Sequence, residues 1–174
     1  MRGCDQFCSY CIVPYVRGRE KSRPISAIVV EVRRLVDGGT REILLLGQNI
    51  TAYGVAEARR DGVYTSEFSA FADLLSSVHA VDGLERIRFT SPHVHFMNDV
   101  FIRTVRDLPK ICKYFHIPLQ SGSDRILKLM RRSYTSAEYL DCVRKLSEGL
   151  DEVNFTTDVI VCFPGETEEE FEMT

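Results

Sequence analysis

The chain has 174 residues, enough for one domain with a substantial core. It is 44% hydrophobic, 27% charged and 10% aromatic, which is the composition of an ordinary globular protein and excludes a low-complexity chain. The formal net charge of −3 gives no support for nucleic-acid binding by the chain as a whole.

After a cysteine-rich opening, the first half of the chain predicts alternating helices and strands. Apolar residues at helical spacing predict an amphipathic helix over 25–36, and the following Gly38 and Gly39 end it. A short apolar run predicts a buried strand over 41–46, and the polar, glycine-containing segment 51–65 predicts a long loop. The next predicted elements are a helix over 66–81 and a strand over 84–89.

The second half continues the alternation and completes the fold prediction. The expected helices cover 97–108, 123–131 and 136–146, the expected strands cover 111–119 and 154–162, and Thr167 is expected to cap a last helix. Strands that alternate with helices indicate an α/β domain built from βαβ units around a parallel sheet, open or barrel-like.

Small and polar residues follow each predicted strand. These segments are 47–49, 90–93, 120–123 and 163–166. In parallel α/β folds, the chemistry takes place beyond the carboxyl ends of the strands. We therefore expect these four segments to meet around one site.

Three of the six cysteines, Cys4, Cys8 and Cys11, lie in the first eleven residues with the spacing C-x3-C-x2-C. A tight loop of this kind can wrap three thiolates around an iron–sulfur cube, because cluster iron prefers thiolate ligands. Three cysteines bind three irons of a 4Fe-4S cluster and leave the fourth open, and an open coordination position marks a reaction site. Tyr10, just before the last cysteine, is expected to stack near a ligand bound there.

Zinc sites and ferredoxin-type clusters fit the three cysteines less well. Structural zinc takes four ligands, usually in two pairs, and the sequence offers at most an irregular partner in His93 and His95. A ferredoxin-type cluster uses a fourth cysteine and the spacing C-x2-C-x2-C. Of the remaining cysteines, Cys112 and Cys142 are expected in the core, and Cys162 lies near the end of a predicted strand.

Compartment and partners are only partly constrained. No signal peptide precedes the cysteines, and no apolar stretch is long enough to span a membrane. We therefore expect a cytoplasmic protein with no membrane partner, where reducing conditions disfavour disulfides. The basic stretch 17–23 is either solvated surface or a contact for a phosphate-bearing partner. No feature indicates the oligomeric state.

Six segments together resemble the radical SAM methylthiotransferases. The cysteine loop continues as IVPYVRG to Gly18, and the matching segments that follow are 46–54 (LGQNITAYG), 86–93 (RIRFTSPH), 117–124 (IPLQSGSD), 129–134 (LMRRSY) and 158–167 (DVIVCFPGET). The resemblance covers essentially all of residues 1–174. It implies an incomplete radical SAM (β/α)6 barrel, a partial TIM-like barrel with parallel strands.

The resemblance also implies a reaction, and it is nearest to the tRNA branch of the family. Those enzymes are transferases that add a methylthio group to C2 of N6-isopentenyladenosine beside the anticodon, using S-adenosylmethionine (SAM) and a 4Fe-4S cluster. The implied partners are a tRNA anticodon stem-loop and an electron donor. The open alternatives are the branches that modify threonylcarbamoyladenosine in tRNA or an aspartate of a ribosomal protein, and a non-catalytic, metal-stabilised RNA-binding module.

The family's site residues carry over to matching positions. Cys4, Cys8 and Cys11 would bind the cluster, and the segment Gly47, Gln48, Asn49 stands where radical SAM proteins hold the SAM amino group. Gln120 and Ser123 follow the strand that meets the ribose or carboxylate, and Asp158 opens the segment that frames the adenine. Loop-ordering hydrogen bonds for Gln48 and Gln120, and a structural carboxylate for Asp158, are the alternatives.

The chain departs from the family pattern in two ways. Cys162 stands where glycine is more common, and a side chain there would crowd the adenine pocket. Val94 stands where proline is common. The family also carries an N-terminal domain with an auxiliary cluster and a C-terminal TRAM domain, and neither has a counterpart in residues 1–174. We therefore expect a central radical SAM domain, truncated at both ends, that does not complete methylthiolation alone.

Overall fold

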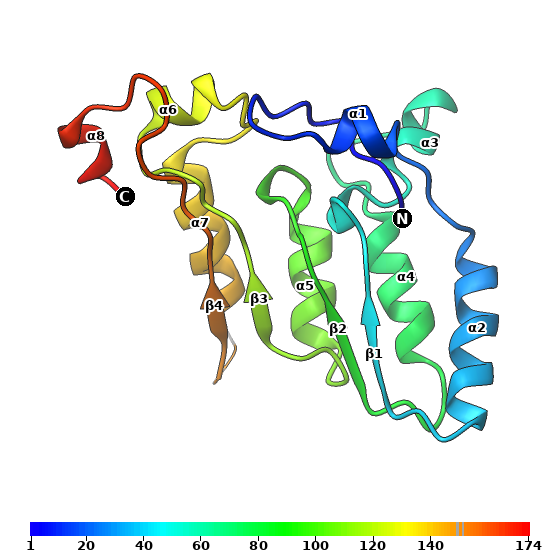
Figure 1. Cartoon of the computed structure of the whole chain (residues 1–174). Coiled ribbons are helices and arrows are strands. Elements are labelled where there is room, and N and C mark those ends of the chain that lie inside the picture. The colour runs from blue at the N-terminus through cyan, green and yellow to red at the C-terminus, as the bar shows by residue number, and fades with distance from the viewer. Residues whose placement is uncertain (149, 151) are drawn as a thin grey trace.

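The computed structural model describes residues 1–148, 150 and 152–174. Four short strands lie side by side: β1 (Glu42–Leu45), β2 (Arg86–Phe89), β3 (Tyr114–His116) and β4 (Asn154–Thr156) (Figure 1). β1 pairs with β2 and β3 pairs with β4, both in parallel, and a parallel bridge between Ile87 and Ile111 joins the two pairs. The predicted α/β organisation with parallel strands is confirmed.

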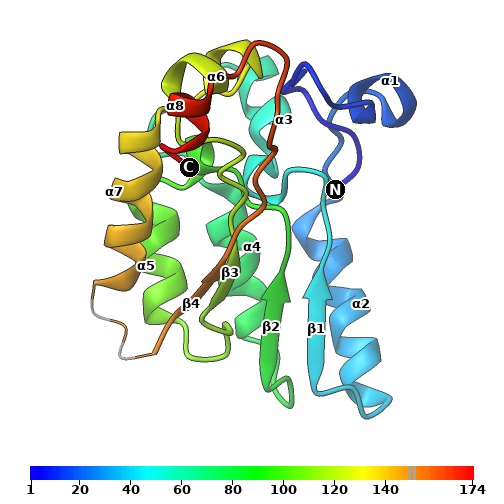
Figure 2. The ribbon, with the colours of Figure 1, turned by 60° about the vertical axis from the view of Figure 1, so that its left-hand side comes forward.

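Helices cover one face of the strands. These are α2 (Ile25–Asp37), α4 (Ala70–His79), α5 (Asp99–Asp107) and α7 (Ser136–Ser147), and the two views agree that they stand on the same side (Figures 1 and 2). The alternation along each strand explains this, because Ile43, Ile87 and Phe115 point toward the helices and are buried. The opposite face is exposed and carries charged side chains beside Leu44, and Arg88 pairs there with Glu42 across the two strands at 3.0 Å.

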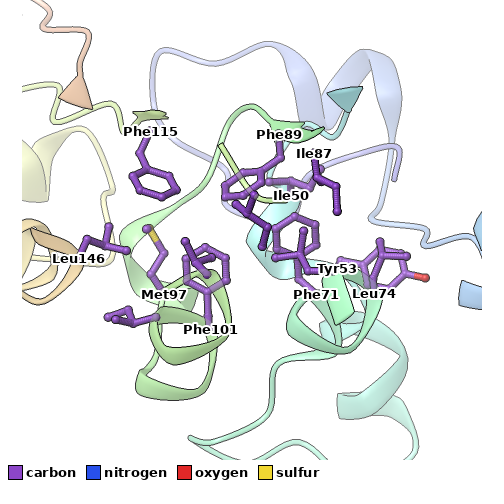
Figure 3. Packing of buried hydrophobic residues seen from close by; sticks show 14 of the residues in the cluster. Ile50, Tyr53, Phe71, Leu74, Ile87, Phe89, Met97, Phe101, Phe115 and Leu146 are labelled. Carbon is purple, nitrogen blue, oxygen red and sulfur yellow. The ribbon is translucent and has the colours of Figure 1, made fainter. Parts of the chain in front are cut away.

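The core between strands and helices is mostly aliphatic and contains a cluster of aromatic rings. Phe71 of α4, Phe89 of β2 and Phe101 of α5 meet ring to ring, with centroids 5.2 to 6.0 Å apart (Figure 3). Phe115 extends the cluster from β3, with its ring centroid 5.9 Å from that of Phe89. Such packing contributes beyond simple burial of apolar area and fixes how the helices sit on the strands.

Most predicted elements are present, with shorter bounds. The helix expected over 66–81 begins only after Ser69, whose side chain accepts a hydrogen bond from the backbone N–H of Ala72. The strands expected over 111–119 and 154–162 shrink to three residues each. The connecting elements are α6 (Asp124–Leu129), the 3-10 turn η2 (Val94–Phe96) and α8 (Glu168–Phe171), the last with the predicted Thr167 cap.

The prediction of a long loop over 51–65 is wrong. A 3-10 turn, η1 (Ile50–Ala52), and a helix, α3 (Val55–Arg60), occupy most of it. Tertiary contacts explain the difference: the Gly54 N–H donates to Ser22 Oγ, and the Ser22 N–H donates to the Glu57 carboxylate. These bonds fasten a short helix whose polar sequence shows no apolar periodicity.

A short helix that the sequence did not indicate follows the cysteines. It is α1 (Val13–Arg17), with Pro14 near its start, where a missing backbone N–H costs nothing. Within the described residues, no helix combines the length and apolarity that crossing a membrane requires.

Candidate functional site

The cysteine loop lies across the carboxyl ends of the strands, beside α6 (Figures 1 and 2). Beneath it is a hollow of about 170 Å³, here called the cysteine cavity. Cys4, Cys8, Cys11 and Tyr10 line it from the loop. The strand ends complete the lining, with Gln48 and Asn49 after β1, Ser91 and His93 after β2, and Gln120 after β3. Three of the four polar strand ends therefore meet the cysteines at one place, and the fourth, 163–166, does not line the cavity as expected.

The base of the loop is fastened by backbone and carboxylate contacts. Gly3 has φ +80°, and a Cβ there would lie 2.1 Å from the Arg19 carbonyl oxygen, so only glycine fits. The Cys4 N–H donates to the Gly18 carbonyl at 3.2 Å. The Asp5 N–H donates to the Glu20 carboxylate, and the Glu20 N–H donates to the Asp5 carboxylate. These contacts hold the loop shape before any cofactor binds.

All six cysteines are free thiols. Burial raises the pKa of Cys4 to about 11, so its thiol is protonated at neutral pH in the chain alone. Metal binding must then release that proton, because the ligand form of cysteine is the thiolate. The loop is not held by a disulfide, and its role as a metal-binding loop stays a prediction.

The arrangement of the potential metal ligands can be compared with that of a zinc site. Within the described residues, no three His, Cys, Asp or Glu side chains come close enough to hold one metal ion. Zinc needs its ligands converging on one point, whereas in an iron–sulfur cube each cysteine binds a separate iron. The three cysteines line one cavity without forming a single-ion site, which is compatible with a cube.

Two buried donors in the cavity lining lack partners. The amide nitrogen of Asn49 and Nε2 of His93 are buried and make no hydrogen bond in the described part of the chain. His93 Nδ1 accepts from the His95 N–H, so the proton of the neutral ring is on Nε2, and burial lowers the His93 pKa well below its usual value. Unsatisfied buried donors are rare and are often found where a ligand completes the site.

Gln120 is strained in the way that site residues often are. It is buried and has φ +73°, a backbone conformation that non-glycine residues seldom adopt. Its backbone is fixed between two contacts, since its N–H donates to the Asp158 carbonyl and its own carbonyl accepts from the Ile160 N–H. The side chain lines the cysteine cavity.

Three predicted cofactor residues lie outside the cavity lining. Gly47 packs against Met1 and Ile50, leaving no room for a Cβ. The Ser123 hydroxyl caps α6 by accepting from the Ile126 N–H and donates to Glu170. The Asp158 carboxylate is exposed and lies 3.2 Å from His116 Nε2 on the polar face of the strands. Their roles toward SAM remain predictions.

Two further residues of the cavity were not assigned from the sequence. Arg132 belongs to the segment 129–134, which entered only as a family-like motif. His93 ends the segment 86–93 and entered as part of a polar strand end and as an irregular zinc partner, without a role toward SAM. Burial of His93 and the contact of Arg132 with Cys8, 3.5 Å from nitrogen to sulfur, became visible only in three dimensions. In the sequence, the signal for these two residues was their place in those motifs.

Comparison with known proteins gives a consistent picture. The profile of the Radical SAM superfamily matches residues 1–174. The tRNA-2-methylthio-N(6)-dimethylallyladenosine synthase of Syntrophotalea carbinolica is 51% identical over 174 residues, covering all of this chain and 38% of the relative. Those of Acetivibrio thermocellus and Aquifex aeolicus are 49% and 48% identical, and the chain covers 35% and 38% of their lengths. The chain thus spans little more than a third of these relatives.

Proposed function

The chain belongs to the radical SAM superfamily, and we propose that it is the SAM-cleaving part of a tRNA methylthiotransferase. The observation that carries the proposal is the cysteine cavity, where three thiols face polar strand ends and two unsatisfied buried donors. The relatives' names supply the reaction, methylthiolation of a dimethylallyl (isopentenyl) adenosine in tRNA.

The residues present fit a 4Fe-4S cluster held by Cys4, Cys8 and Cys11. When bound, such a cluster supplies an open iron and one electron for cleaving SAM to methionine and a 5′-deoxyadenosyl radical. Gln48 and Asn49 offer amide groups at the end of β1, within the same cavity as the cysteines. They would orient the amino group of the methionyl end, and Tyr10 would cover the ligand from the loop.

The remaining lining residues place the other end of SAM. Gln120, held in its strained conformation, would direct its amide to the ribose or carboxylate. The Nε2–H of His93 is a fixed donor, since its low pKa keeps the ring neutral at physiological pH. Burial of these donors excludes water from the acceptor that they would bind.

The fold supports the same proposal. Helices stand on one face of the parallel strands (Figure 2). The uncovered face carries the Arg88–Glu42 and His116–Asp158 pairs. We infer that this face is the interior of an incomplete (β/α)6 barrel. A polar interior would accept a nucleotide, whereas a sheet buried on both faces would be apolar.

The proposed partners follow from the reaction. A tRNA anticodon stem-loop would present the adenosine above the cysteine cavity, and a one-electron donor would reduce the cluster. A cytoplasmic location is proposed because tRNA is the substrate.

Isotope transfer tests the proposal. The anaerobically reconstituted chain is incubated with SAM, a reductant and an RNA hairpin carrying N6-isopentenyladenosine deuterated at C2. If the radical removes that atom, one deuterium appears in the 5′-deoxyadenosine product, which mass spectrometry detects. The control is the same hairpin with deuterium at C8.

Two results would contradict parts of the account. A cluster-loaded chain that releases no 5′-deoxyadenosine lacks the proposed SAM chemistry. Cleavage of SAM with deuterium transfer only from a threonylcarbamoyladenosine hairpin would assign the chain to that other branch.

A further inference from the structure

Arg132 places a positive charge against one of the three cysteines. It lies in the linker between α6 and α7, and its Nη1 is 3.5 Å from Cys8 Sγ and 3.4 Å from the Tyr10 hydroxyl. Its Nε donates to the Tyr134 hydroxyl at 3.0 Å, and the guanidinium lies over the Tyr134 ring, 4.8 Å from its centroid. The side chain is therefore held at four points and is directed into the cysteine cavity.

The charge of Arg132 has no carboxylate partner in residues 1–148, 150 and 152–174, although the residue is partly buried in the cavity wall. The ion pairs of the described residues include thirteen contacts, and none involves Arg132. Charges withdrawn from water are ordinarily paired, because their desolvation is costly. A negatively charged group bound in the cysteine cavity would supply such a partner.

The linker is itself fastened to the cysteine loop. The Ser9 N–H donates to the Met130 carbonyl, and the Ser9 hydroxyl donates to the Leu129 carbonyl, both at 3.0 Å. On the other side of Arg132, the Tyr134 hydroxyl contacts the Pro118 carbonyl at 2.9 Å. The guanidinium is thus fixed between the loop and the end of β3, so its distance to Cys8 does not depend on a freely moving side chain.

We propose that Arg132 positions the Cys8 ligand and raises the reduction potential of the bound cluster. This inference rests on the proposed function, since it needs the cluster. An N–H···S hydrogen bond and a nearby positive charge both favour the more negative, reduced state of an iron–sulfur centre. Arginine suits the role because its planar group donates from Nη1 to Cys8 and Tyr10 and from Nε to Tyr134 at the same time, whereas lysine has a single nitrogen.

Potentiometric titration followed by EPR tests the proposal on the anaerobically reconstituted chain. The variants are R132M, which removes the charge and the bond, and R132K, which keeps only the charge. R131M is the matched control, because Arg131 is adjacent and exposed and makes no side-chain hydrogen bond or ion pair within the described residues. For R132M we expect roughly a tenfold lower ratio of reduced to oxidised cluster at a fixed potential, about 59 mV for one electron.

The outcomes separate this inference from the proposed function. R132K should fall between wild type and R132M, and R131M should match wild type. A fully loaded R132M with the wild-type potential would overturn the role of Arg132 and leave the proposed function intact. A wild-type chain that takes up no iron would overturn both. If R132M does not fold, R132Q takes its place, because it also removes the charge, and a fully loaded R132Q with the wild-type potential would overturn the role of Arg132.

Discussion

Replacing Glu20 with glutamine should stabilise the chain at alkaline pH. The Glu20 side chain is buried beside the cysteine loop, where its Oε1 accepts the Asp5 N–H at 3.1 Å. Burial, aided by the nearby carboxylates of Asp5 and Glu57, raises the pKa of Glu20 to about 7 from an ordinary value of 4.5. Glutamine keeps the accepting oxygen and removes the charge, so the hydrogen bond to the loop survives.

The raised pKa sets the sign and size of the effect. The folded chain holds the Glu20 proton more tightly than the unfolded chain, so the free energy of unfolding falls as the pH rises from 4.5 to about 7. At about 1.4 kcal/mol per pKa unit, the ceiling of this loss is about 3 kcal/mol. Screening by solvent at the loop edge lowers it, and we expect about 1–2 kcal/mol.

Urea denaturation of wild type and E20Q at pH 4.5 and pH 8, in reductant and without metal, measures this difference. E20Q should be about 1–2 kcal/mol more stable than wild type at pH 8, and the two should converge at pH 4.5. E67Q is the matched control, since it makes the same substitution at an exposed glutamate. An E20Q chain that is no more stable than wild type at pH 8 would refute the reasoning.

Two other substitutions probe the core and the loop. F101A removes a fully buried ring that meets Phe71 and Phe89, and should lower the free energy of unfolding by about 3–5 kcal/mol in urea titrations. A loss below about 1 kcal/mol would mean that this cluster does not carry the fold. G3A places a Cβ 2.1 Å from the Arg19 carbonyl oxygen and should reduce iron uptake, whereas G62A, where a Cβ meets open space at a similar positive φ, should not. Equal iron in the two glycine variants would contradict the role of Gly3.

Much of the fold followed from apolar periodicity. The segments whose burial alternates or repeats every three to four residues, such as 25–36, were predicted nearly to their ends, because their partners are the core itself. The helix α3 was missed, since it is polar and depends on Ser22, a residue far away in the sequence. Contacts of that kind leave no local pattern.

The site was predictable where ligand chemistry fixes spacing. The sequence predicted that the three cysteines and the polar strand ends would lie together, and most of them line one cavity, because parallel βα units bring strand ends to one edge. Ligation by the cysteines stays a prediction. Arg132 was not, because two adjacent arginines look alike in a sequence. The positive φ of Arg131, +57°, turns the chain so that only its neighbour faces Cys8. That distinction depends on backbone geometry.

The content of iron and sulfide after anaerobic reconstitution tests the central claim most directly. Wild type should hold about four irons and four sulfides per chain, and C8A should lose most of them. C162A is the matched control, because Cys162 is exposed and lies outside the cavity lining; it should load like wild type. A C8A chain with a full cluster, or a wild-type chain that binds one zinc and no iron, would contradict the account.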